Sequence, residues 1–361
     1  MKPLALLRRR ARHAAPRVED DATWRPLVSA PDDRPWYEVH TNLRLAQTLY
    51  RTNPLAARIV GMTTDFVIGR GLTLSGDAWV SAFWQHPQNR MDLRVYRWCD
   101  ELTRAGELFI VLSSNPVDGM QYVREVPAQQ IDAIETDPHD LERELSYHQI
   151  TADPLGLTWP GSAHPDALSA DQVMLHLAIN RPLGETRGYS DLHQIAKWLD
   201  RYDQWLEDRV RINRFKGAYL WHVQIDHALP AQLEAKRAQY SRIPKPGSLI
   251  ISDGSEKWSA VQPHIDADDA AADGKAIRLM VAAGAGIPLH FLAEGESATR
   301  ATAREMGTAT YRHFVHRQHV FESLLRTIID TAALRAGRGR PTYAFGFEPV
   351  LADEGAAAGA L

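Results

Sequence analysis

The stretch from Arg187 to Phe215 places the strongest constraint on what this chain can fold into. It contains no proline, and no glycine after Gly188, so nothing in it interrupts a helix. We predict a helix from about Asp191 to Arg214, capped by Ser190 and Asp191 and roughly 36 Å long at 1.5 Å per residue. Because it is long for a globular domain, packing against copies of itself is favoured over burial inside one domain.

One face of this predicted helix is apolar, and acids and bases crowd the rest of its surface. The apolar positions recur at three- and four-residue spacing and are Leu192, Ile195, Leu199, Tyr202, Leu206 and Val210, with Trp198 and Trp205 widening the face. Such an apolar face is too long to be buried by one small core, so we expect further helices or other copies of the chain to pack against it.

Composition limits the remaining possibilities. The 361 residues allow two or three domains with a sizeable core. A net charge of −4 argues against a tight DNA clamp, which needs a dense basic surface. The single cysteine, Cys99, excludes a disulfide framework and a cysteine metal site. No apolar run has the length of a membrane span.

The chain before the long helix divides into a basic arm, a helical part and a β-rich part. We predict helices at 36–50, 54–67, 79–85 and 93–105, the second begun by Asn53 and Pro54 and the last ended by Gly106. A turn at Gly69–Gly71 leads into a short strand. Further short strands are predicted at 108–112, 121–126, 131–134, 145–150 and 172–178.

Beyond the long helix, the pattern predicts a small module and then two more helices. Strands at 218–225, 248–252 and 257–261 and a helix at 230–240 form the module. A helix at 268–283 follows and is broken by Gly284–Pro288, and a very long helix covers 298–336. A short strand at 342–347 precedes a tail rich in alanine and glycine. Two helices therefore bracket a small α/β module.

No motif in the chain carries a bond-making constellation. Gly188–Leu192 resembles a hydrolase nucleophile elbow around Ser190, but Leu192 stands where the second glycine is required. His313, His316 and His319 rotate by about 60° per step on a helix, which favours a polar helix face over a zinc site. Asp132 and Glu135 lie in a strand and turn without a matching base, so we expect them to be solvated.

An ordered set of short strings resembles the portal proteins of tailed bacteriophages, the ring at the capsid vertex through which DNA is packaged. The strings are Asn53–Leu55 followed by Asp65–Gly71, Arg104–Ile110, His176–Leu192, Lys245–Ser248, Gly284–Pro288 and Ala298–Met306. Together they span most of residues 36–336 in the order that the family has them.

The resemblance implies an α+β fold with the family's regions. A flexible basic arm would cover 1–35, a helical and then β-rich wing 36–186, the first stem helix 187–215 and a small α/β clip 216–265. The second stem helix would cover 266–285, a tunnel loop 286–297 and a long wing helix 298–336. A short strand and disordered tail would occupy 337–361. Little then remains to build a crown.

The resemblance also implies sites and partners. DNA would pass the tunnel loop at Gly286, His290, Phe291, Glu294, Glu296 and Ser297. Stem contacts between subunits would involve Trp198, Tyr202, Trp205, Asp203, Glu207 and Arg211. Arg237, Arg242 and Lys245 of the clip would dock the packaging motor. No metal and no cofactor is expected.

The expected assembly is a dodecameric ring at the portal vertex of a phage or prophage virion, formed in the host bacterial cytoplasm and bound to no membrane. Its partners would be double-stranded DNA, the terminase large subunit, a head-completion or adaptor protein, and the major capsid and scaffold proteins. The chain would be a structural protein and not an enzyme. The packaging energy would come from a partner ATPase, because this chain has no G-x-x-x-x-G-K-[ST] loop. The alternatives are a serine hydrolase using Ser190 and a DNA-binding scaffold without a ring.

Overall fold

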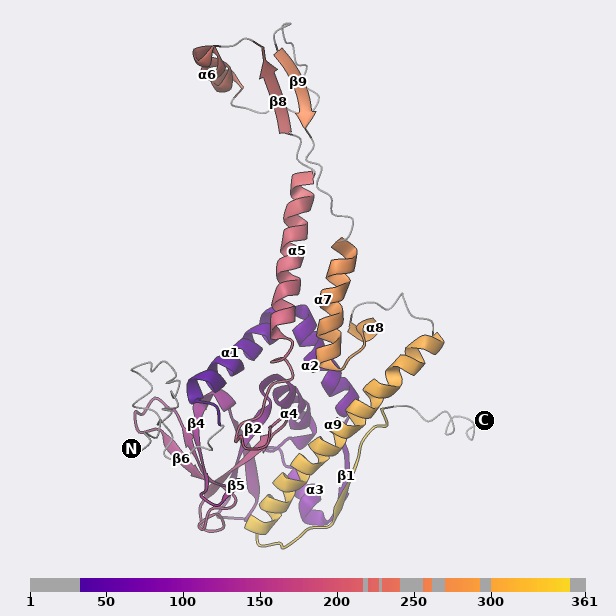
Figure 1. Cartoon of the computed structure of the whole chain (residues 1–361). Helices are drawn as coiled ribbons and strands as arrows, with labels where there is room; N and C mark the ends of the chain where they lie inside the picture. The colour runs from indigo at the N-terminus through magenta and orange to yellow at the C-terminus, as the bar shows by residue number, and fades with distance from the viewer. Residues whose placement is uncertain are drawn as a thin grey trace, which may run out of the picture. The chain divides into compact units, whose positions relative to one another are not determined.

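The computed structural model describes residues 33–216, 220–226, 229–240, 256–261, 270–292 and 300–350 (Figure 1). The chain forms two compact units. The first contains the residues up to Ala196 and from Ala282 onward, and the second contains Lys197–Val281. Helices and antiparallel strands occur in both units, which confirms the α+β class. The strand predicted at 248–252 and most of the predicted N-terminal arm lie outside the described residues.

Four helices open the first unit, and local sequence signals begin or end three of them. They are α1 (Trp36–Thr52), α2 (Pro54–Val67), α3 (Ala78–Gln85) and α4 (Met91–Ala105). The Asn53 side chain accepts a hydrogen bond from the Ala56 amide at 3.0 Å and begins α2, as predicted. Asp77 caps α3 in the same way through the Val80 amide at 2.9 Å. Gly106 ends α4 with a φ of 83°.

A three-stranded sheet forms the centre of the first unit, in the order β3-β2-β7. Its strands are β2 (Glu107–Ser114), β3 (Gln121–Val126) and β7 (Gln172–Ala178), all antiparallel. The central strand β2 is buried along most of its length, with Phe109, Ile110 and Leu112 fully buried. The Asn89 side chain covers the free edge of β3 by donating to the Gln121 carbonyl at 3.0 Å and accepting from the Val123 amide at 3.1 Å.

Two smaller strand groups extend this sheet region. The turn η2 (Ala128–Gln130) leads to β4 (Ile131–Asp137), β5 (Asp140–Gln149) and β6 (Leu157–Pro160), in the order β4-β5-β6. Strand β6 was not predicted. Strands β1 (Thr73–Gly76) and β10 (Tyr343–Gly346) were each predicted, and they pair with one another antiparallel across the length of the chain.

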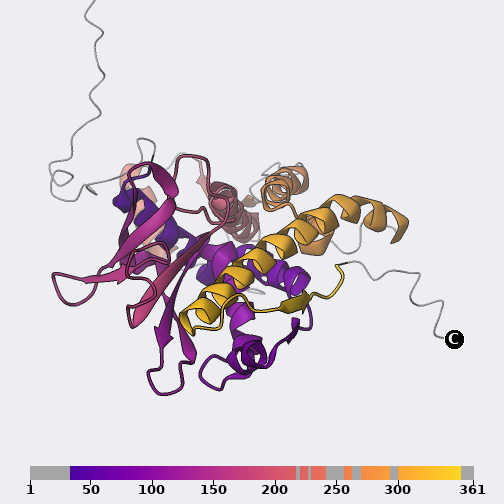
Figure 2. The same cartoon turned by 90° about the horizontal axis from the view of Figure 1, so that it is seen from below.

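The longest helix, α9 (Arg300–Arg335), runs diagonally across the first unit, where it is the yellow-orange helix of Figure 2. The Phe314 ring stacks on Phe66 of α2 with 4.5 Å between centroids. Gln318 donates to the carbonyls of Phe66, Val67 and Glu348. At the far end of α9, Arg335 donates to the Ser114 hydroxyl at 3.0 Å. The helix therefore fastens α2, the β10 segment and the central sheet together.

The second unit contains most of the long helix α5 (Ala196–Lys216) and of α7 (Ala270–Ala285). Between them come β8 (Leu220–Ile225), α6 (Pro230–Gln239) and β9 (Glu256–Val261), with β8 and β9 antiparallel. A short helix, α8 (Leu289–Leu292), follows α7 within the predicted tunnel loop and was not predicted. No helix in the described part of the chain is both long and apolar enough to cross a membrane.

The start of α5 differs from the prediction. The helix begins at Ala196, and residues 191–195 form turns. The expected caps are used elsewhere: the Ser190 hydroxyl accepts from the Leu192 amide at 3.0 Å, and Asp191 is bound to Arg317 and Asn180. The predicted apolar positions Leu192 and Ile195 are nevertheless fully buried. Tertiary contacts, which local sequence signals do not reveal, therefore decide where this helix begins.

Candidate functional site

The α5 and α7 helices contact each other in the second unit through aromatic and basic side chains. The Tyr202 and Trp205 rings stack with 5.8 Å between centroids and 11° between planes. The Arg278 guanidinium of α7 lies 5.8 Å from the Tyr202 ring centroid. A β-carbon on Gly274 of α7 would lie 2.6 Å from the Trp205 ring, so only glycine allows this approach. These contacts place Tyr202 and Trp205 within one chain, and contacts with a second copy remain a prediction.

Part of the apolar surface of α5 and α7 is uncovered in the single chain. Leu206 and Val210 of α5 are 41% and 51% exposed, and Leu279 and Met280 of α7 are 49% and 45% exposed. Trp198 is half-buried, with the Arg201 guanidinium 4.8 Å from its ring centroid. The predicted apolar face is therefore buried near the start of α5 and exposed farther along it.

The charged residues predicted for subunit contacts lie on the same helix. Arg211 pairs with Glu207 at 3.4 Å and with Asp208 at 3.5 Å, and all three side chains are about two-thirds exposed or more. Asp203 is also exposed. Exposed pairs of this kind contribute little to stability, so their role in assembly remains a prediction.

In the small α/β module, one carboxylate of β9 binds side chains at the end of α6. Glu256 accepts from Lys236 at 2.5 Å, from the Tyr240 hydroxyl at 2.8 Å and from the Trp258 indole at 3.4 Å. These hydrogen bonds, that of Lys236 first, lower the pKa of Glu256. The predicted docking residue Arg237 is exposed on α6, 3.8 Å from Glu234. Arg242 and Lys245 lie outside the described residues.

A charge cluster formed by Glu107, Glu144, His176, Arg181 and Arg187 joins the two sheets to the segment that leads into α5. Arg187 binds Glu107 through two nitrogens at 2.6 and 2.9 Å, and the two side chains are 5% and 0% exposed. Arg187 also donates to the Ile131 carbonyl at 2.8 Å. Burial would raise the pKa of Glu107, but Arg187 and His176 outweigh it and lower the pKa to about 2.

His176 lies at the centre of this cluster, between two carboxylates. Its Nε2 is 3.2 Å from Glu107, its Nδ1 is 3.0 Å from Glu144, and its ring stacks on Phe109 with 4.4 Å between centroids. Burial would lower the pKa of His176, but Glu144 and Glu107 outweigh it and raise the pKa. Both ring nitrogens face carboxylate oxygens, an arrangement that favours a doubly protonated imidazolium.

Further contacts position the segment before α5. The Arg34 guanidinium lies 3.5 Å from the Tyr189 ring centroid and binds Glu185 at 3.0 Å. Asp33 accepts from the Thr186 hydroxyl at 2.5 Å. Arg317 of α9 forms an ion pair with Asp191. The segment before α5 is thus attached to the central sheet, to α9 and to residues before α1.

The described part of the predicted tunnel loop packs against aromatic rings. Gly286 has a φ of 66°, and its carbonyl accepts from the Thr310 hydroxyl of α9 at 3.4 Å. The Phe291 ring lies 6.0 Å from Phe66 and 4.3 Å from His290, measured between centroids. Glu294, Glu296 and Ser297 lie outside the described residues. That the loop faces DNA remains a prediction.

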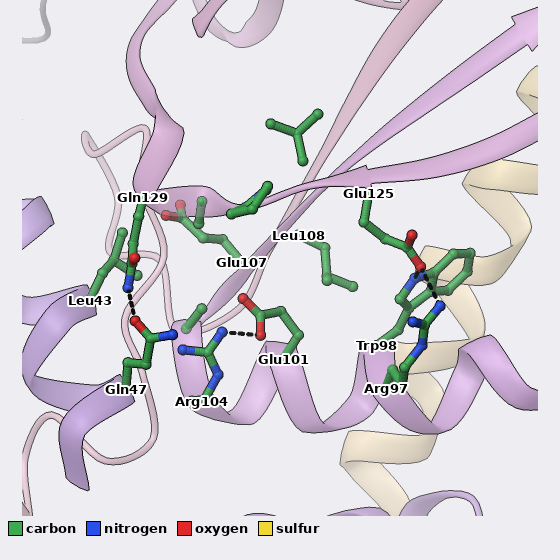
Figure 3. Close-up of a pocket in the computed structure, with 14 residues that line it drawn as sticks. Leu43, Gln47, Arg97, Trp98, Glu101, Arg104, Glu107, Leu108, Glu125 and Gln129 are labelled. Carbon is green, nitrogen blue, oxygen red and sulfur yellow. Dashed lines mark hydrogen bonds and ion pairs between the residues drawn. The ribbon is translucent and has the colours of Figure 1, made fainter. Parts of the chain in front are cut away.

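The first unit also contains an open pocket of about 310 Å³ between α1, α4 and the end of β3, which sequence reasoning did not identify (Figure 3). Its polar side chains bind each other: Gln129 donates to Gln47 at 2.8 Å, Trp98 donates to Glu125 at 2.8 Å, and Arg104 pairs with Glu101. Its lining contains no serine, histidine or cysteine. The pocket therefore offers no histidine, thiol or serine hydroxyl for catalysis.

The residues considered for catalysis have structural partners. The Ser190 hydroxyl donates to the Thr103 carbonyl at 3.4 Å, and no described histidine or carboxylate is hydrogen-bonded to it. Asp132 is not simply solvated, as we expected, but binds His148 at 2.6 Å. Burial raises the pKa of the Cys99 thiol to about 12. Among the described residues no group of three or more His, Cys, Asp or Glu side chains could hold a metal ion.

Comparison with known proteins agrees with the family resemblance in the sequence. No protein-family model matches the chain, and no curated protein matches it. A chain in the neck of an empty gene transfer agent particle, computed with C6 symmetry, is similar with a TM-score of 0.60 and 15% identity, covering 83% of this chain and 84% of that one. A chain in the native neck, computed with C12 symmetry, gives 0.59 and 15%, covering 95% and 93%. The chain has a portal-like fold.

A weaker similarity is found with an HK97-family phage portal protein from Corynebacterium diphtheriae. Its TM-score is 0.44 at 12% identity, covering 88% of this chain and 98% of that one. None of the three chains is more than 15% identical to this one.

Proposed function

We propose that the chain is a portal protein, the subunit of a ring at one vertex of a phage or prophage head. Duplex DNA would enter and leave the head through this ring. The observation that carries the proposal is the similarity to the neck chain of the native gene transfer agent particle over 95% of this chain and 93% of that one. A match to one unit alone would be compatible with another role for that unit. The similarity to the neck chain instead covers both units.

The surface chemistry supports a ring-forming subunit. Four large apolar side chains on α5 and α7 are exposed in the single chain. In a ring, neighbouring copies would cover them. Mild net acidity suits a conduit, because DNA must pass without being held. In this proposal α5 and α7 form the stem, residues 216–265 the clip, and residues 36–186 together with α9 the wing.

The proposed partners follow from the same assignment. The clip would dock the terminase large subunit during packaging and a head-completion or adaptor protein afterwards, while the wing would face the major capsid and scaffold proteins. The ring would be a dodecamer located in the virion, assembled in the host cytoplasm. The packaging energy would come from the terminase.

Particle production in a host that carries the phage or prophage tests this function. Deletion of the gene should give heads without packaged DNA, and the intact chain supplied from a plasmid should restore DNA-filled particles. The readout is nuclease-protected DNA per head. DNA-filled heads in the deletion strain would contradict the proposal.

A further inference from the structure

The first half of α9 carries an unbalanced positive charge. From Arg300 to His319 the sequence has four arginines and three histidines against one acid, Glu305. The remaining part of the helix, from Val320 to Arg335, has two acids and two arginines. The excess of bases is therefore confined to the half of α9 that follows the predicted tunnel loop.

Two of these bases serve the packing of the first unit. Arg317 pairs with Asp191, and its side chain is only 11% exposed. The His313 ring lies beside Phe314 with 5.4 Å between centroids and is within 4 Å of the β-carbon position of Gly286. Neither side chain needs a further partner to explain its position.

Three other bases, Arg312, His316 and His319, form what we call the α9 stripe. At 100° per residue they fall within a sector of about 60° on the side opposite the buried Phe314, and they span about 10 Å along the helix. All three are exposed, and none forms an ion pair or hydrogen bond within the described part of the chain. Ala309, one turn earlier, is small and exposed, so it does not obstruct the stripe.

We propose that the α9 stripe contacts the phosphate backbone of duplex DNA, an assignment that rests on the proposed portal function. Arginine binds phosphate through paired N–H donors, and a neutral imidazole still donates one N–H to a phosphate oxygen. Three donors in one row make a weak contact that exchanges easily, as a conduit requires. Repetition around a ring would give many such contacts without a deep basic groove.

Salt-dependent binding of the purified full-length chain to a 30-base-pair duplex tests the proposal. Each lost phosphate contact lowers the slope of log K against log salt by about 0.9, so R312A should reduce the slope by about one. The matched control is R44A, which removes one exposed arginine from α1. It should leave the slope unchanged. H316A/H319A should weaken binding less than R312A.

Two results would overturn the assignment. Equal slopes for R312A and R44A would mean that the stripe is an ordinary solvated face. Loss of ring formation by R312A with unchanged DNA binding would mean that a neighbouring copy covers the stripe. Electron microscopy of the same samples separates failure of the portal function from failure of DNA contact by the α9 stripe. Absence of rings in the unaltered chain would count against the portal function and not against DNA contact.

Discussion

Two ion pairs, one from each unit of this chain, place their charges in opposite environments. In the first unit, Glu107 and Arg187 are almost completely buried and bind through paired hydrogen bonds. In the second unit, Glu207 and Arg211 are largely exposed on α5 at a separation of 3.4 Å. A buried pair fixes backbone segments that are distant in sequence, whereas an exposed pair leaves its side chains available for partners. The buried pair thus fixes the fold of the first unit, whereas the exposed pair contributes little to the fold of the second.

Removing one member of the buried pair should have the largest effect on stability. R187A leaves Glu107 charged and unpaired in the interior and should reduce the free energy of unfolding by about 3–5 kcal/mol. The control R211A removes the same side chain from an exposed pair and should change it by less than about 0.5 kcal/mol. Urea unfolding monitored by tryptophan fluorescence measures both. Similar losses for the two variants would remove the distinction between the units.

The close contact between Gly106 and the segment before α5 should give the next largest effect on stability. Gly106 has a φ of 83°, and a β-carbon there would lie 2.2 Å from the Tyr189 carbonyl carbon. G106A should therefore destabilise the chain by at least about 3 kcal/mol, since backbone strain and steric overlap add. Gly119 has a φ of 72° but open space around it, so G119A should cost only about 1 kcal/mol. Equal thermal shifts in calorimetry would show that Tyr189 moves aside freely.

The exposed face of α5 should affect assembly rather than the stability of the subunit. L206D adds a charge at an apolar position that is already 41% exposed, so unfolding of the monomer should change little. Ring formation should be lost, because the charge would be buried between copies. N213D adds the same charge at an exposed polar position of α5 and should still form rings. Analytical ultracentrifugation distinguishes these results, and rings formed by L206D would contradict this role of the face.

The smallest predicted effect is on the pH dependence of stability. The pKa of His176 is raised in the folded chain, so its contribution is present below the unfolded value of 6.5 and is lost as pH rises through the folded value. Glu107, with a lowered pKa of about 2, contributes above 4.5 and loses that contribution as pH falls toward 2. H176Q should therefore flatten the decline in melting temperature on the alkaline side. An unchanged profile would exclude an imidazolium at this position.

The sequence predicted elements that carry their own local signals. Asn53 and Pro54 mark the start of α2, and Gly106 marks the end of α4, because capping depends on residues only three or four positions apart. The start of α5 was predicted about five residues early. Its expected caps, Ser190 and Asp191, bind Thr103 and Arg317 instead, which are distant in the sequence.

Long-range pairing was the part that could not be predicted. Glu107 and Arg187 are 80 positions apart, and no periodic pattern relates them. The same holds for β1 and β10, whose residues Leu74 and Phe345 face each other across nearly the whole chain. The pocket in Figure 3 could not be predicted because three segments that are separate in the sequence line it. The family resemblance supplied the portal-like fold class, but not these pairings.

We propose above that this subunit assembles into a ring with a channel for DNA. Electron microscopy of the purified full-length chain across a range of concentrations tests it most directly. We expect closed rings of uniform subunit number, with a central opening wide enough for duplex DNA. A compact monomer at every concentration would contradict ring formation. The contradiction would be strongest if L206D and the unaltered chain behaved identically.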